Sequence, residues 1–180
     1  MNELTKACHE LGFELTKPLT PGLEKNELKE LVLKHSPSIV ITSHPHDGHK
    51  THEKCSEVVL GVLGELNFKG SVVFHEYWFP QKNPNLLIEI PENDVVKMIK
   101  ALLHHEGEII RNPYHLRLPH SLIENSRRGS EIILGVQKES SNLLFSSIMT
   151  KGKIINQNFV QDSEKCLISS SDELSLCFGN

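Results

Sequence analysis

The sequence lacks long hydrophobic runs, paired cysteine motifs and a strong charge of either sign. No apolar stretch in its 180 residues approaches the ~20 residues that a membrane-spanning helix needs. The four cysteines include no CxxC pair, which argues against a cysteine zinc site, so we expect separate, reduced thiols and a cytoplasmic protein. The net charge of −4 gives no sign of a nucleic-acid partner.

Histidine, in contrast, is abundant, and one stretch holds four of the eleven: His44, His46, His49 and His52. The stretch begins with an apolar, β-branched run at 39–42, which is typical of a buried strand. A polar loop follows, and a helical apolar pattern begins at about Thr51. Ligands of open α/β sheets bind beyond the carboxyl ends of the strands, so these histidines are candidates for a ligand or metal site.

His49 and His52 are three residues apart, so on a helix they share one face. The start of a helix disfavours a positive charge, which keeps an imidazole there neutral. A neutral imidazole is the form that binds a metal or polarises a carbonyl. The pattern therefore favours metal or acid–base chemistry at this strand–loop–helix junction.

Residues 42–59, TSHPHDGHKTHEKCSEVV, resemble the second conserved motif of the PIG-L/LmbE metal-dependent N-deacetylases, which reads HP-x-x-GHPDH before a helix. Residues 78–90, 97–112 and 118–135 resemble later parts of the family more diffusely. The resemblance implies an α/β fold with a Rossmann-like, three-layer parallel sheet. It also implies an enzyme that removes the acetyl group of an N-acetylated amino sugar such as N-acetylglucosamine, using water activated by zinc or another divalent metal.

The resemblance assigns roles to individual residues. His52 matches the family's metal ligand, and His49 matches the histidine that stabilises the oxyanion or assists the leaving group. Thr51 stands where the family has the aspartate that pairs with that histidine, which puts the charge state of His49 in doubt. We expect Asp47 to stabilise the helix start, and we count it with His49 as a candidate catalytic residue.

The family's first motif, AHPDDE, supplies a histidine and an aspartate as metal ligands and another aspartate as general base, and no part of this sequence matches it. We therefore expect an N-terminally incomplete domain whose sheet lacks a central strand, leaving an open edge and exposed apolar surface. A partner chain that supplies the missing half, or a homo-oligomer, would cover that edge. His44 and Asp47 reproduce the His-Pro-x-Asp spacing of the missing ligands, so His44 is a second candidate metal ligand, with a plain loop role as the alternative.

Three further residues are candidates for substrate binding. Trp78 lies in an aromatic cluster that either stacks on a sugar ring or belongs to the core. His105 matches a family histidine that has either a binding or a structural role. Arg128 either binds a polar substrate group or lies on a solvated, salt-bridged helix.

The periodicity predicts alternating helices and strands in a domain at 1–160, followed by a polar, loosely ordered tail at 161–180. Helices are expected at 3–11, 25–35, about 51–66, 92–111 and 118–128. Strands are expected at 38–42, 71–75 and 85–90, with a strand or an extended edge at 13–19. A β-hairpin is expected from 143–148 and 153–159, turning at Lys151 and Gly152.

Three functional hypotheses remain open from the sequence. The first is a deacetylase polypeptide acting on an amino sugar, with acidic residues supplied by another chain. The second is a non-catalytic remnant or binding subunit, which Thr51 in place of aspartate favours. The third is a self-contained metal-binding protein that uses the histidine cluster.

Overall fold

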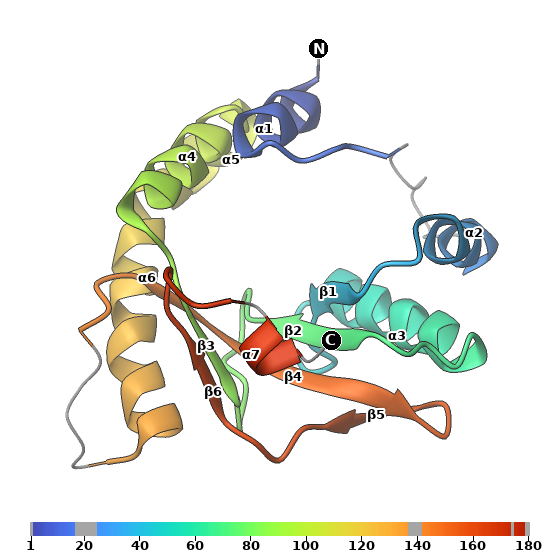
Figure 1. Cartoon of the computed structure of the whole chain (residues 1–180). Helices are drawn as coiled ribbons and strands as arrows, with labels where there is room; N and C mark the ends of the chain where they lie inside the picture. Colours follow the sequence, from blue (N-terminus) through green and yellow to red (C-terminus); the bar gives the residue numbers. More distant parts are fainter. Residues whose placement is uncertain (1, 17–24, 137–141, 174, 179–180) are drawn as a thin grey trace.

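A six-stranded mixed sheet forms the centre of the computed structural model, which describes residues 2–16, 25–136, 142–173 and 175–178 (Figure 1). The strand order is β1-β2-β4-β3-β6, and β5 pairs with β4. β1 runs parallel to β2 and β3 runs parallel to β6, whereas β4 is antiparallel to its neighbours β2, β3 and β5. The strands are β1 Ile39–Ser43, β2 Ser71–His75, β3 Leu86–Glu89, β4 Ser146–Ile155, β5 Asn158–Gln161 and β6 Cys166–Ile168.

α3 and α6 pack on one face of this sheet, α7 packs on the other face, and α1, α4 and α5 form an arm beyond the sheet (Figure 1). They are α1 Glu3–Leu11, α2 Lys25–His35, α3 Lys50–Glu65, α4 Glu92–Leu103, α5 Glu106–Arg111, α6 Tyr114–Gly129 and α7 Ser175–Phe178, with a π-helical turn, η1, at Ser130–Leu134. α1 packs along α4, and α4 packs on α6, which in turn contacts β4. The arm of α1, α4 and α5 is therefore held to the sheet through α6.

Alternate residues of β2 separate the two faces of the sheet. Val72 and Phe74 join the core cluster with Leu63 of α3, whereas Val73 joins a second cluster on the other face with Leu86. The second cluster also contains Cys177 of α7, and among the described helices α7 is the one whose residues take part in it. The face that carries Val72 and Phe74 is thus covered by the long helix α3, and the face that carries Val73 by the short helix α7.

α6 approaches the sheet closely because it carries a glycine at the contact. A Cβ atom on Gly129 would lie 2.3 Å from Cδ1 of Leu87, a side chain that is fully buried in β3. Leu87 has no room to move in a close-packed core, so only glycine fits at this position. This contact sets the distance between α6, and hence the arm, and the sheet.

β1 lies at one edge of the sheet, and its described strand partner is β2. Its central residue Ile41 is 61% exposed, an unusual value for the middle of an apolar strand. The sequence predicted an open sheet edge and exposed apolar surface without assigning them to a strand. The predicted cause, an N-terminally incomplete domain, stays a prediction.

Most of the expected elements are present, and the differences have local causes. The helix expected at 92–111 is two helices, because His105 takes a non-helical conformation (φ −89°, ψ 65°) and caps the start of α5. Glu106 and Glu108 then lie in the first turn of a new helix, where the helix dipole favours acidic residues. The extended edge expected at 13–19 forms no strand at 13–16, and its remainder lies outside the described residues.

The predicted C-terminal hairpin exists but turns at a different place. β4 continues through Lys151 and Gly152 to Ile155, and the chain reverses at Asn156 and Gln157, which both have positive φ. Asparagine tolerates the left-handed region, and two such residues in succession suit the tight turn of a β-hairpin. The polar pattern of this stretch concealed the strand, since β4 buries both Thr150 and Lys151.

The segment expected to be a loosely ordered tail contributes instead to the fold. Cys166–Ile168 forms β6 beside β3, and α7 packs next to it. The prediction of four separate thiols is also wrong, because Cys166 and Cys177 form a disulfide, whereas Cys8 and Cys55 are free. Sequence spacing gave no warning of this pairing, which arises because the chain turns back from β6 to α7.

Candidate active site

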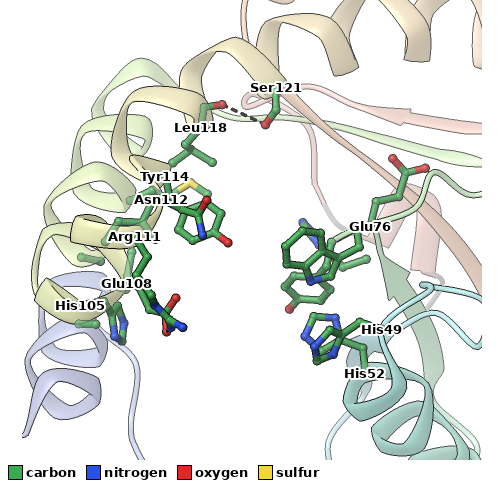
Figure 2. A pocket seen from close by; sticks show the side chains of 18 residues that line it. His49, His52, Glu76, His105, Glu108, Arg111, Asn112, Tyr114, Leu118 and Ser121 are labelled. Carbon is green, nitrogen blue, oxygen red and sulfur yellow. Dashed lines mark hydrogen bonds and ion pairs between the residues drawn. The ribbon is translucent and has the colours of Figure 1, made fainter.

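A cleft of about 900 Å³ opens beyond the carboxyl ends of β1 and β2. Figure 2 shows its two sides: His49, His52 and Glu76 on one, and His105, Glu108 and Arg111 on the other. We call the first side the histidine wall; it consists of the loop and first helical turn after β1 (residues 44–52) and of the end of β2 with its following loop (residues 75–81). The second side, the helical wall, is formed by α1, α4, α5 and the start of α6.

Asp47 anchors the histidine wall. Its side chain is fully buried, and Oδ1 accepts a hydrogen bond of 2.7 Å from Nδ1 of His52. Oδ2 accepts the backbone N–H groups of Tyr77 and Trp78 at 3.3 and 3.1 Å. Burial raises the pKa of Asp47, but the hydrogen bonds from Trp78 and His52 outweigh it and hold the pKa below its usual value.

The bond to Asp47 also fixes the orientation of His52. A carboxylate only accepts hydrogen bonds, so Nδ1 of His52 must carry the proton. In the neutral ring, Nε2 is then an acceptor, and the ring lines the cleft. An imidazole held in this way by a buried carboxylate can serve as a general base or as a metal ligand.

His44, by contrast, points into the protein. It is 5% exposed, its Nε2 donates to the carbonyl of Phe79 at 2.8 Å, and its Nδ1 accepts the backbone N–H of His46 at 3.3 Å. Both ring nitrogens are engaged: Nε2 joins the loop after β1 to the loop after β2, and Nδ1 bonds within its own loop. Binding a metal through His44 would require these contacts to break.

Three consecutive aromatic residues follow β2, and each is more than half exposed: Tyr77, Trp78 and Phe79. The ring of Trp78 stacks on His49 at 6.1 Å with an interplanar angle of 15°, and the ring of Tyr77 meets His52 edge-on at 5.1 Å. Trp78 is therefore not core, as the sequence left open, but part of an aromatic surface beside the two histidines.

His75 and Glu76 line the cleft, although sequence reasoning did not single them out. Burial lowers the pKa of His75 and so favours its neutral form. Glu76 accepts the backbone N–H of Gln81 at 2.6 Å and pairs with Arg128 of α6. The rule that ligands bind beyond the carboxyl ends of parallel strands would have selected both, since they end β2 as the histidine loop ends β1.

The other substrate-binding candidates lie in different positions relative to the cleft. His105 lines the helical wall, with its Nδ1 3.8 Å from Glu3 of α1. Arg128 does not line the cleft, but its guanidinium pairs with Glu76, which does. His105 is therefore part of the helical wall, whereas Arg128 contacts the histidine wall.

The described residues do not fit a catalytic zinc ion on their own. Catalytic zinc is normally held by three protein ligands, and the described part of the chain contains no group of three or more His, Cys, Asp or Glu placed to hold a metal. His52 presents one nitrogen, both oxygens of Asp47 are engaged, and so are both nitrogens of His44.

No known protein family profile matches the chain. Among solved structures it is similar to the conserved protein TT1542 from Thermus thermophilus, with a TM-score of 0.61 and 12% identity over 82% of this chain and 69% of that one. It is also similar to an N,N'-diacetylchitobiose deacetylase from Pyrococcus horikoshii, with a TM-score of 0.57 and 13% identity over 83% and 61%. A third structure, the A40926 pseudoaglycone deacetylase Dbv21, gives a TM-score of 0.55 and 12% identity over 82% and 66%.

These similarities confirm the predicted α/β fold of the LmbE/PIG-L-type deacetylases. They are similarities of fold, because so few residues are identical. Among curated proteins, the chain is similar to the probable serine/threonine-protein kinase roco8 of Dictyostelium discoideum, at 27% identity over 146 residues. That match covers 78% of this chain but only 7% of the relative's length. None of the helices in the described ranges is long and apolar enough to cross a membrane.

Proposed function

We propose that this chain binds an N-acetylated amino sugar in the cleft and supplies the histidine wall of a deacetylase site. The observation that carries the proposal is the pair of Asp47 and His52, which sits at the carboxyl end of β1 in a deacetylase fold. The chemical class of the substrate is suggested by the chitobiose deacetylase among the structural neighbours. The exposed ring of Trp78 beside His49 offers a surface on which a sugar ring can stack.

Hydrolysis of an acetamide requires attack of water on the carbonyl carbon, followed by cleavage of the C–N bond to give acetate and a free amine. His52, with its proton directed to Asp47, has Nε2 available to accept a proton from water. His49, whose ring centre is 4.6 Å from that of His52, is placed to donate a hydrogen bond to the carbonyl oxygen. The further acidic groups come, in this proposal, from another polypeptide or a second copy of the chain.

The test compares acetylated and free amino sugars as ligands of the purified chain. N,N'-diacetylchitobiose should bind, and its deacetylated form chitobiose with free amines should bind at least about tenfold more weakly. His52→Ala should weaken binding of the acetylated sugar by a similar factor, whereas the exposed His46→Ala should leave it unchanged. Equal binding of both sugars, or binding indifferent to His52, would overturn the proposal.

A second candidate function is sugar binding without hydrolysis. It is favoured by Thr51, and by the absence of a three-ligand metal group from the described residues. Acetate release from diacetylchitobiose, measured with and without added Zn²⁺, separates the two. Release that His52→Ala abolishes supports hydrolysis by this site; binding without release, including after addition of extract from the source cells, supports the second function.

A further inference from the structure

The end of the chain is fastened to the sheet by a cysteine pair on the side away from α3. Cys166 lies in β6 and Cys177 lies in α7, eleven residues further on. Their Cα atoms are 6.1 Å apart, which is within the range that a disulfide spans. Cys177 is 7% exposed, whereas Cys166 is partly exposed. The more accessible sulfur thus belongs to the strand and the buried one to the segment that packs on it.

A buried lysine forms a second attachment to the same segment. Lys151 of β4 is 6% exposed, and its ammonium contacts the backbone carbonyl of Cys177. The same ammonium lies 3.1 Å from a carboxylate oxygen of Asp162 and 5.5 Å from the ring centre of Phe178. The segment therefore supplies both a carbonyl and an aromatic face to a charge that is otherwise buried beside one carboxylate.

The segment covers apolar surface of the sheet. Cys177 joins a buried cluster with Val73, Leu86 and Ile168, and Phe178 packs against that cluster. Val73 lies two residues before His75 on β2, so the two side chains share a face. The covered surface consequently borders the cleft that His75 lines.

We propose that Cys166 and Cys177 form a reversible redox modification site whose co-reactant is a small disulfide such as oxidised glutathione. The disulfide latches α7 (Ser175–Phe178) onto β6 of the sheet. Reduction releases the latch and exposes the apolar surface around Val73 and Leu86. This site lies apart from the sugar-binding residues, and its existence does not depend on the proposed deacetylase function.

Oxidised glutathione is the oxidant that forms the disulfide between Cys166 and Cys177. The thiolate of the accessible Cys166 attacks one sulfur of oxidised glutathione, which forms a mixed disulfide and releases one glutathione. The thiolate of Cys177 then attacks the sulfur of Cys166 and releases the second glutathione. Two electrons pass from the protein thiols to the glutathione disulfide, and the two thiol protons end on the two glutathiones.

The first experiment counts free thiols with a maleimide and mass spectrometry. After treatment with oxidised glutathione and removal of the excess, two cysteines, Cys8 and Cys55, should be labelled. After dithiothreitol all four should be labelled, once the protein is unfolded in the presence of the reagent. Four labelled thiols in the glutathione-treated protein, or two glutathione adducts in place of a disulfide, would contradict the proposal.

The second experiment measures the latch itself. Reduction should lower the thermal midpoint of the wild-type protein by roughly 5–10 °C, the size expected for a disulfide closing a short loop in a domain of this length. It should also speed hydrogen exchange of the amides of residues 166–178 by at least about tenfold. The matched control, Cys8→Ser, should show the same two changes, whereas Cys166→Ser should resemble the reduced protein and not respond to dithiothreitol.

Two outcomes with the wild-type protein alone would overturn the proposal of a disulfide latch. If reduction of the wild-type protein changes neither the midpoint nor the exchange of residues 166–178, the cysteine pair is not a latch. If exchange rises evenly over the whole chain, reduction destabilises the fold as a whole, and the proposal of a local release is wrong.

Discussion

The two walls of the cleft are held in place in different ways. The histidine wall is tied together by contacts between residues far apart in sequence: Asp47 binds the backbone of Tyr77 and Trp78, and His44 binds the carbonyl of Phe79. The helical wall is held by the packing of α1 on α4 and of α4 on α6, whereas its exposed charged side chains Glu108 and Arg111 pair with each other on one helix. The polar groups of the histidine wall are therefore fixed by bonds between distant segments, and those charged side chains of the helical wall are not.

This difference assigns separate tasks to the two walls. Groups that take part in proton transfer or hold a carbonyl oxygen must be preorganised, because their positioning has to be complete before the reaction. Side chains that contact the rest of a substrate can be exposed and ion-paired with a neighbouring residue and still contribute to binding. Asp47 is the residue on which the histidine wall depends most.

Removing the Asp47 carboxylate should have the largest effect. Asp47→Ala leaves three donors, Nδ1 of His52 and the backbone N–H groups of Tyr77 and Trp78, without their acceptor, so we expect a loss of about 3 kcal/mol in the free energy of unfolding, measured in urea. Asp94→Ala is the matched control: Asp94 is half-exposed and paired with Lys97 on the same helix, and its loss should change stability by less than about 0.5 kcal/mol. Similar losses in the two variants would show that Asp47 does not anchor the wall.

The attachment of the helical wall can be tested at glycines. Gly129→Ala introduces a methyl group 2.3 Å from Leu87 and should cost about 2 kcal/mol by overpacking. Gly107→Ala, in α5, meets open space and should be neutral or slightly stabilising, since alanine favours a helix. Thermal midpoints of the two variants measure this, and an unchanged midpoint in Gly129→Ala would mean that α6 shifts without penalty.

The contribution of each wall to sugar binding can be compared directly. Trp78→Ala should weaken binding of diacetylchitobiose about tenfold, or ~1.4 kcal/mol, because it removes the stacking surface beside His49. Arg111→Ala on the helical wall should weaken it by less than about threefold, because the side chain is exposed and already paired. Titration calorimetry gives both constants, and a reversed order of effects would refute the division of tasks.

The smallest expected effect is a pH dependence of stability from His75. Burial lowers its pKa in the folded state, so the unfolded chain takes up the proton first as the pH falls. The contribution of neutral His75 to the free energy of unfolding is fully present above the pKa of the unfolded chain, about 6.5. It is lost as the pH falls from there toward the lower pKa of the folded protein. Unfolding in urea at pH 7.5 and 5.5 should show a smaller drop in His75→Phe than in wild type; equal drops would exclude His75 as a cause.

The positions of most elements followed from the sequence alone. α1 and α2 have the predicted ends, and the strands β1, β2 and β3 lie within a residue or so of their expected ranges. These segments show clear apolar periodicity and have caps such as Gly12, whose left-handed conformation ends α1. Where polar residues are buried for tertiary reasons, as in β4 with Thr150 and Lys151, periodicity failed.

The sequence by itself determined that the histidines gather at the start of a helix after an apolar strand, and the family resemblance of that stretch predicted the α/β fold, although the sheet is mixed and not parallel as predicted. Only the tertiary structure decided which of them faces the cleft. His44 turns inward because the loop after β2 offers it a carbonyl, and His52 is oriented because Asp47 lies buried against two N–H groups of that same loop. Those partners are some thirty residues away along the chain. The pairing of Cys166 with Cys177 has the same character, because a hydrogen bond or disulfide depends on distance in space, which residue spacing does not specify.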